Sequence, residues 1–194
     1  MKIAICIKQV PDSWAEKKMA AGVLDRANVD AVLNDLDEYA VEEALRIVEA
    51  NSPTKEAGEA SGHSITLISM GPERATEAIR KALSMGADDA ILVSDPALAG
   101  SDALATSLVL AAVIKKGNYD LVLCGTESTD ARMSVIPAMI SQRLGWAQLT
   151  FAGKVKVDLA GSAVEIERVT EFGNQVMGAK FPVILSVVEK INEP

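Results

Sequence analysis

One polar stretch of the chain carries most of the side chains that could take part in chemistry. An apolar run over residues 121–124 leads into Gly125, and an apolar helix pattern begins at about Met133. Glycine lets the backbone leave a strand in conformations closed to other residues, and free amides at a helix start attract anions. The stretch predicts a phosphate cradle for a nucleotide that is held and not hydrolysed, although a plain connecting loop has the same outline. Its uncharged donors are Thr126, Ser128, Thr129 and Ser134.

The elements around this stretch alternate between strands and helices. Strands are expected over residues 2–8, 63–69, 90–93 and 119–124, and helices over residues 36–50, 73–85 and 101–116. Apolar strands that alternate with helices indicate a parallel sheet covered on both faces. We therefore expect an α/β fold whose core is formed by residues 1–150 and whose ligands bind at the carboxyl ends of the strands.

Short strand patterns continue after Trp146. They cover residues 154–159, 163–170, 175–179 and 183–188, with turn residues around Gly161 and Gly173. This spacing predicts an antiparallel β meander over residues 151–194. Core and meander are expected to form a single nucleotide-binding domain, residues 1–194.

The connections carry weaker patterns. Residues 22–33 lack helical spacing and indicate a small irregular hairpin. Asn34 followed by Asp37 resembles a capping box at the start of a helix. Residues 51–62 are rich in small and polar residues and indicate a solvated loop, and Gly86 indicates a helix end.

Composition excludes several classes of partner. The net charge of −8 and the pI near 4.8 argue against nucleic acid and anionic membranes, which both require a basic face. The longest apolar stretch, residues 103–114, is too short to span a bilayer, so we expect a buried helix, no membrane insertion and a cytoplasmic protein. Cys6 and Cys124 both fall in expected strands and are expected to fill the core.

The motifs of common nucleotide-dependent enzymes are missing. No GxGxxG follows the first strand, and no GxxxxGK[ST] occurs. His63 starts a strand, where a solvated or capping role is favoured over catalysis or metal binding. Among the acidic residues, Asp130 is the candidate functional residue, because it lies in the central loop just ahead of Arg132. The alternative is that it only caps the following helix. We expect binding without turnover, and therefore no enzyme activity.

Several stretches together resemble the β subunit of electron transfer flavoprotein. The opening IAICIKQVPD is similar to that family's first strand and its lysine, and NDLDEYAVEEA is similar to its helix start. SMGPERATEAIRKALSMGADDAILV resembles its central strand, Gly-Pro turn and helix. The family signature near the end matches at Ile166, Arg168, Glu171, Gly173, Gln175, Pro182, Ile184, Leu185 and Ser186.

The resemblance implies an electron carrier subunit without catalytic residues. Its fold would be a Rossmann-like sheet of the adenine-nucleotide α-hydrolase type that buries a structural AMP. FAD would lie at the interface with a flavin-carrying α subunit, which would hold most of it. Electrons would come from dehydrogenases such as acyl-CoA dehydrogenases and pass to a quinone reductase. Whether the nucleotide site takes AMP or a second FAD, as in bifurcating relatives, stays open.

Carried onto matching positions, the AMP contacts fall on four parts of the chain. They are Cys6 and Lys8 on the first strand; Asn34, Asp35, Leu36 and Asp37 at the helix start; Met70 beside the Gly-Pro turn; and Gly125, Thr126, Glu127, Ser128, Thr129, Asp130, Arg132, Met133, Ser134, Val135 and Ile136 in the loop. The family's acidic run and glutamine are reduced here to Asp130. Arg132 suits a bidentate contact with phosphate.

The family continues beyond the position of Pro194 into a segment that docks on the α subunit and recognises dehydrogenases. We therefore expect that this polypeptide alone does not support normal electron transfer. Two alternatives have related folds. A free-standing adenine-nucleotide sensor of the universal-stress type lacks the Glu171-x-Gly173-x-Gln175 signature, and an ATP pyrophosphatase has a Ser-Gly-Gly-x-Asp loop after its first strand.

Overall fold

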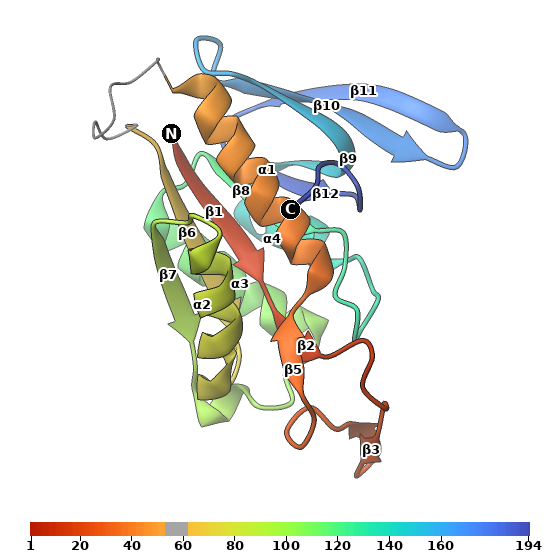
Figure 1. Ribbon diagram of the computed structural model, residues 1–194. Helices are drawn as coiled ribbons and strands as arrows, with labels where there is room; N and C mark the ends of the chain where they lie inside the picture. Colours follow the sequence, from red (N-terminus) through yellow and green to blue (C-terminus); the bar gives the residue numbers. More distant parts are fainter. Residues whose placement is uncertain (53–61) are drawn as a thin grey trace.

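The computed structural model describes residues 1–52 and 62–194. Its main sheet contains β1 (Lys2–Ile7), β6 (Ser64–Met70), β7 (Asp89–Val93), β8 (Leu121–Gly125), β9 (Ala147–Asp158), β10 (Ala163–Thr170), β11 (Gly173–Lys180) and β12 (Val183–Val187). The order of these eight strands across the sheet is β11-β10-β9-β12-β8-β1-β6-β7 (Figure 1). β1 pairs in parallel with both β6 and β8.

In the described part of the chain, four α-helices cover this sheet. They are α1 (Asp35–Asn51), α2 (Thr76–Ser84), α3 (Ala103–Gly117) and α4 (Ile136–Leu144), and short 3₁₀ turns η1 (Glu73–Ala75) and η2 (Pro96–Leu98) precede α2 and α3. Gly86 follows α2 with φ of +128°, as the expected helix end requires. Of the loop expected over residues 51–62, residues 53–61 lie outside the described residues, and Asn51 is the last residue of α1.

Strand β1 separates two hydrophobic cores. Ile3, Ile5 and Ile7 face the core under α1 and α2, whereas Ala4 and Cys6 face the core under α3 and α4. Successive side chains of a strand point to opposite faces, so a strand covered on both faces is apolar throughout. This arrangement confirms the expected α/β fold with a parallel sheet between two layers of helices (Figure 1).

The last strand differs from the sequence prediction. β12 does not continue the antiparallel meander but pairs in parallel with β8 and with the first part of β9. Antiparallel pairing joins only β9, β10 and β11 in this region. All residues of β12, VILSV, are buried. Because the run is apolar on both faces, it suits a position between two strands under helices better than a solvated meander.

Helix α3 also differs from its prediction as a buried helix. Its inner face buries Ser107, Leu110, Ala111 and Ile114. On its outer face, Leu104 is 59% exposed and Leu108 is 56% exposed. An apolar composition alone does not show that only one side of the helix is covered. None of the helices within residues 1–52 and 62–194 combines the length and the hydropathy that crossing a membrane requires.

A small arm extends beyond the end of β1. Strands β2 (Gln9–Pro11) and β5 (Ala31–Leu33) pair at its base, and β3 (Met19–Ala20) pairs with β4 (Val23–Leu24) near its tip (Figure 1). We call residues 12–30 the arm. The irregular hairpin expected over residues 22–33 is therefore part of a longer excursion that starts at β2.

Candidate functional site

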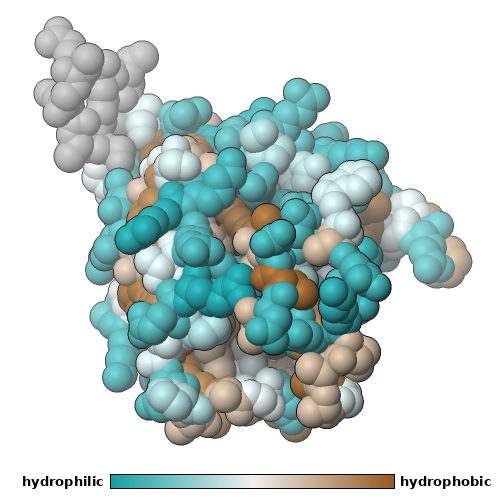
Figure 2. Space-filling model, turned by 60° about the horizontal axis from the view of Figure 1, so that its bottom comes forward, coloured by the Kyte–Doolittle hydropathy of each residue, from teal (hydrophilic) through white to brown (hydrophobic). Residues whose placement is uncertain are grey.

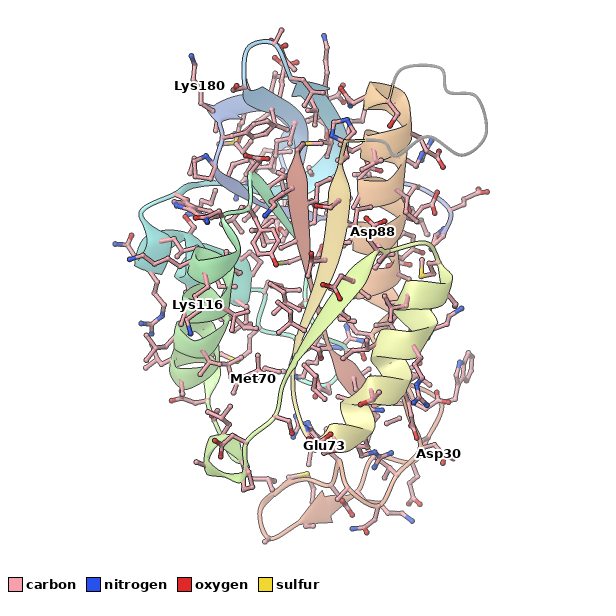
Figure 3. The ribbon with its side chains drawn as sticks, turned by 90° about the vertical axis from the view of Figure 1, so that its left-hand side faces the viewer. Asp30, Met70, Glu73, Asp88, Lys116 and Lys180 are labelled. Carbon is pink, nitrogen blue, oxygen red and sulfur yellow. The ribbon has the colours of Figure 1, made fainter. Side chains whose placement is uncertain are left out.

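The carboxyl ends of β1 and β8 lie side by side at one edge of the sheet. The parallel register places Cys6 opposite Cys124, so the chain leaves both strands at the same level. The arm follows β1 and forms the lower end of Figure 1, and residues 125–136, which we call the site loop, follow β8. Met70 and Glu73 lie toward this end in Figure 3, and Lys180 lies at the opposite end. Parallel sheets bind their ligands at such an edge.

Asn34 connects the start of α1 to the site loop. It is fully buried. Its Nδ2 donates to the carbonyl oxygen of Glu127 at 2.9 Å, and its Oδ1 accepts from the backbone N–H of Thr129 at 3.1 Å. Asn34 occupies the N-cap position, but its side chain makes no capping bond, so the predicted capping box is wrong. A primary amide both donates and accepts, and here it satisfies two backbone groups of the loop instead.

Asp37 lies in the first turn of α1 and joins that helix to the end of β1. The side chain is buried, and its Oδ2 accepts from the backbone N–H of Lys8 at 2.8 Å. Burial raises the pKa of Asp37 to about 7, against the opposing effect of hydrogen bonds from Asn34 and Lys8. Asp37 is therefore a structural carboxyl that titrates near neutral pH.

Gly125 packs directly against this turn. A Cβ at Gly125 would lie 2.6 Å from Oδ1 of Asp37 and 2.6 Å from the carbonyl oxygen of Leu36. Gly125 is not among the glycines with positive φ and still pairs with Val187 in the sheet. The expectation that Gly125 is needed for a backbone conformation closed to other residues is therefore wrong. Glycine is required because the backbone of α1 approaches β8 too closely for any side chain.

Asp130 is the most buried charge of the site loop. Its side chain is 1% exposed, and Nζ of Lys8 donates to both of its oxygens, at 2.7 and 2.9 Å. Nε of Arg26 donates to Oδ2 at 2.7 Å. Burial acts to raise the pKa of Asp130, but hydrogen bonds from Lys8, Ser128 and Arg26 outweigh burial and hold that pKa below its ordinary value. The carboxylate therefore stays charged and links three separate parts of the chain.

The rear of the site loop is held by local contacts. Arg132 donates to Glu127 at 3.3 Å, and Ser134 donates to the other oxygen of Glu127 at 2.9 Å. Both Arg132 and Ser134 have positive φ, at 49° and 54°. Such a backbone cannot be helical, so α4 begins at Ile136 and not at about Met133 as predicted. The first-turn amides therefore lie further along the chain than the predicted phosphate cradle places them.

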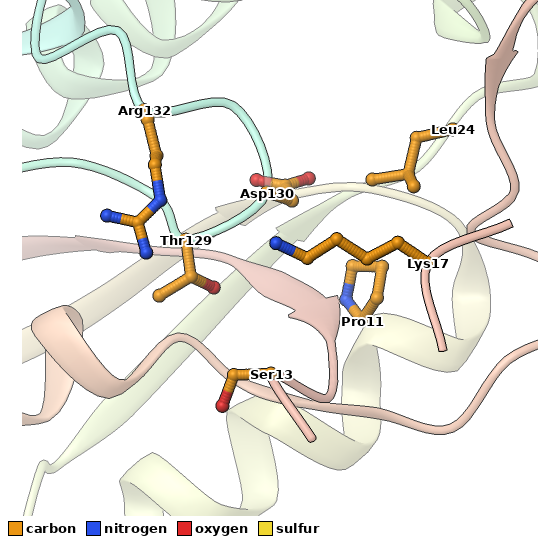
Figure 4. Close-up of a pocket in the computed structure, with 7 residues that line it drawn as sticks. All are labelled: Pro11, Ser13, Lys17, Leu24, Thr129, Asp130 and Arg132. Atoms are coloured by element: carbon orange, nitrogen blue, oxygen red, sulfur yellow. The ribbon is translucent and has the colours of Figure 1, made fainter. Parts of the chain in front are cut away.

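A small pocket lies between the arm and the site loop (Figure 4). Its volume is about 100 Å³, well below the roughly 300–1,000 Å³ of typical small-molecule pockets. It has room for a small group such as a phosphate and not for a whole nucleotide. The lining residues are Pro11, Ser13, Lys17 and Leu24 from the β1 side, and Thr129, Asp130 and Arg132 from the site loop.

The structure brings some of the predicted site residues together and leaves others apart. Asp35 and Met133 are exposed, and Met70 ends β6, on the far side of β1 from the site loop. Thr126 donates to the carbonyl oxygen of Val187, and Val135 precedes α4. The residues that meet around the start of the site loop are Lys8, Asn34, Leu36, Asp37, Gly125, Glu127, Ser128, Thr129 and Asp130.

Sequence reasoning missed two arginines of this region. Arg26 pairs with Asp130, and Arg74 donates to the carbonyl oxygens of Arg26, Ala27 and Val29 at 3.2, 2.7 and 3.1 Å. The one local signal was Asp25, whose carboxylate accepts from Asn28 and closes a turn around Arg26. Nothing in the spacing of residues links Arg26 to Asp130, because the pair is separated by 104 residues.

Cys6 and Cys124 face the same core from neighbouring strands. Both are buried free thiols, which confirms that they fill the core. The neighbouring Cys6 thiol and burial together raise the pKa of Cys124 well above its ordinary value. The thiol of Cys124 is therefore protonated at neutral pH. Contact of Cys6 with a nucleotide stays a prediction.

The hydroxyl and charged groups of this edge are largely bound to other groups of the protein, as Ser134 is to Glu127 and Lys8 is to Asp130. No group of His, Cys, Asp or Glu within residues 1–52 and 62–194 is arranged to hold a metal ion. Figure 2, which brings this end of the molecule forward, shows hydrophilic residues mixed with smaller hydrophobic areas.

Comparisons with known proteins identify the family. The family described as electron transfer flavoprotein domain matches residues 21–194. The electron transfer flavoprotein subunit beta of Mycobacterium tuberculosis is 46% identical over 99% of this chain and 71% of its own length. That of Megasphaera elsdenii is 39% identical over all of this chain and 71% of its own length, and the protein FixA of Azorhizobium caulinodans is 36% identical over all of this chain and 68% of its own. The chain therefore belongs to the electron transfer flavoprotein family, as a homologue of its β subunits.

Proposed function

We propose that this chain binds AMP as a structural nucleotide at the carboxyl ends of β1 and β8. The observation that supports the proposal is the convergence of Lys8 and Asn34 on the site loop, with Asp37 bound to the backbone of Lys8. These contacts hold the loop backbone in one arrangement before any ligand arrives, which lowers the entropic cost of binding. The remaining backbone groups at the edge suit the polar rim of an adenine ring, and the adjoining pocket suits a phosphate.

The same proposal gives the chain a place in electron transfer. It pairs with a flavin-carrying α subunit, helps enclose FAD at their interface, and so passes electrons from acyl-CoA or other dehydrogenases towards a quinone reductase in the cytoplasm. FAD supplies the redox chemistry when bound, and this chain acts as a single nucleotide-binding domain without catalytic residues. Trp14 is 95% exposed and Met19 is 68% exposed on the arm, and exposed apolar side chains beside a ligand edge favour a partner surface there.

The proposal is tested by identifying the nucleotide that leaves the purified chain on gentle acid or heat treatment. We expect AMP, equimolar with the protein, and no flavin colour in the absorbance spectrum. Released FAD would replace the structural-AMP proposal with a site for a second flavin. A chain that releases nothing and binds no added AMP would overturn the proposal.

The partner is tested separately by co-expression with a tagged α subunit of a relative. We expect the two chains to purify together and to carry yellow flavin. Independent elution of the chain, with flavin retained by the α subunit alone, would contradict the proposed role in enclosing FAD.

A further inference from the structure

The arm is anchored over the site by two arginines, Arg26 and Arg74, that were not among the predicted site residues. At its base, the backbone N–H of Asp12 donates to the carbonyl oxygen of Asp30 at 2.9 Å. Arg74, in the 3₁₀ turn after β6, binds three carbonyl groups within residues 26–29. Arg26 then reaches Asp130 in the site loop. These contacts fix both ends of the arm, so that its middle faces the site loop.

Lys17 is the cation of the arm that lines the pocket. Figure 4 shows its side chain extending towards Thr129 and Asp130. Within the described residues Lys17 forms no ion pair, whereas its neighbour Lys18 pairs with Glu16 at 3.5 Å. Hydroxyl groups of Ser13 and Thr129 line the same pocket. An uncommitted ammonium with hydroxyl donors beside it is a suitable setting for an anion.

The charge around this pocket is opposite in sign to that of the whole chain. The carboxylate of Asp130 is already compensated by two cations, which reduces its repulsion of an incoming anion. The lining residues and their ion-pair partners carry a surplus of two positive charges in a chain of net charge −8. The charged groups are Lys8, Lys17, Arg26 and Arg132 against Glu127 and Asp130.

We propose that this pocket is the phosphate subsite of the nucleotide site, with Lys17 as the arm's phosphate ligand and the Arg26–Asp130 pair as the contact that holds the arm over it. The inference rests on the proposed nucleotide binding and adds residues that no motif assigned. It follows that the arm selects a phosphorylated adenosine over adenosine itself.

Lys17→Gln and Lys18→Gln form a matched pair of variants for the test. Both remove one positive charge from adjacent positions, but only Lys17 lines the pocket. Binding of AMP and of adenosine to the 194-residue chain, freed of bound nucleotide, is measured by titration calorimetry. We expect Lys17→Gln to weaken AMP binding roughly tenfold, the loss of one charge-assisted hydrogen bond, and to leave adenosine binding unchanged. Lys18→Gln should change neither by more than about twofold.

Arg26→Gln tests the closing contact on the same protein. We expect faster dissociation of AMP, measured by chase with unlabelled nucleotide, because the arm loses its bond to the site loop. Equal AMP affinities of the two lysine variants, or an equal loss of adenosine binding in Lys17→Gln, would overturn the subsite while leaving nucleotide binding intact. A wild-type chain that binds neither ligand would instead overturn the proposed function and this inference with it.

Discussion

The two halves of the site loop are held in different ways. Residues 125–130 are fixed by partly buried contacts to distant parts of the chain: Asn34 lies 93 and 95 residues from its loop partners, and Lys8 lies 122 residues from Asp130. Residues 131–136 are held by Glu127, seven residues or fewer away, through Arg132 and Ser134. The Arg132 side chain is 66% exposed, whereas that of Asp130 is 1% exposed.

This difference separates a fixed half from an adaptable half. Buried hydrogen bonds to charged groups are worth more than exposed ion pairs, which water and salt weaken. The first half of the loop should therefore keep its shape with or without a ligand. The second half can rearrange at little cost when a nucleotide or a partner approaches.

Substitution of Gly125 should have the largest effect, because the fixed half depends on its close approach to α1. Gly125→Ala brings a methyl group within 2.6 Å of Leu36 and Asp37, and should lower the free energy of unfolding by roughly 3 kcal/mol in urea titrations. Gly178→Ala is the control, since its new Cβ meets only the Val164 carbonyl oxygen at 3.4 Å. Equal losses in both variants would mean that the contact with α1 is unimportant.

The titration of Asp37 should be visible as a pH dependence of stability. Its pKa is raised from 3.8 to about 7 in the folded chain, which therefore keeps a proton that the unfolded chain releases. The contribution of Asp37 to stability should decline as pH rises from about 4 to about 7, and stay constant above that. Asp37→Asn keeps an acceptor for the Lys8 amide and should remove this decline. The free energy of unfolding of both proteins is measured in urea at pH 5 and pH 8. An equal change with pH in variant and wild type would contradict the role of Asp37.

Asp130 and Glu127 offer a direct comparison of the two kinds of contact. Asp130→Asn removes the charge shared by Lys8 and Arg26 and should cost about 2 kcal/mol of unfolding free energy. Glu127→Gln weakens only the contacts to Arg132 and Ser134 and should cost less than about 1 kcal/mol. The Asp130 pKa is lowered, so the loss in Asp130→Asn should vanish as pH falls below the ordinary aspartate range. A larger loss for Glu127→Gln would reverse our assignment of the fixed half.

Truncation of Arg132 should have the smallest effect. Arg132→Ala removes an exposed ion pair and should change the free energy of unfolding by no more than about 0.5 kcal/mol, as measured by thermal unfolding. Arg132→Gly should be at least as stable as Arg132→Ala, because the residue has φ of 49°. A strong loss in either variant would show that the second half of the loop is not adaptable.

Much of the fold could be predicted because it depends on local patterns. The apolar runs of β1, β6 and β8 and their alternation with helices are visible along the sequence. The position of β12 was not predicted, since pairing with β8 depends on contacts between segments about sixty residues apart. The start of α4 was placed too early because positive φ at Arg132 and Ser134 leaves no mark on residue type.

The sequence by itself determined the family and the α/β class, and it identified the polar loop after β8 as the candidate site. Residue type, spacing and hydrophobic period carry that information. The tertiary structure alone decided how the loop is held. Asn34 binds the loop and does not cap the backbone of its own helix, Gly125 leaves room for the close approach of α1, and Arg26 of the arm pairs with Asp130. Burial and hydrogen bonding between distant segments set these roles, and both arise only when the chain is folded.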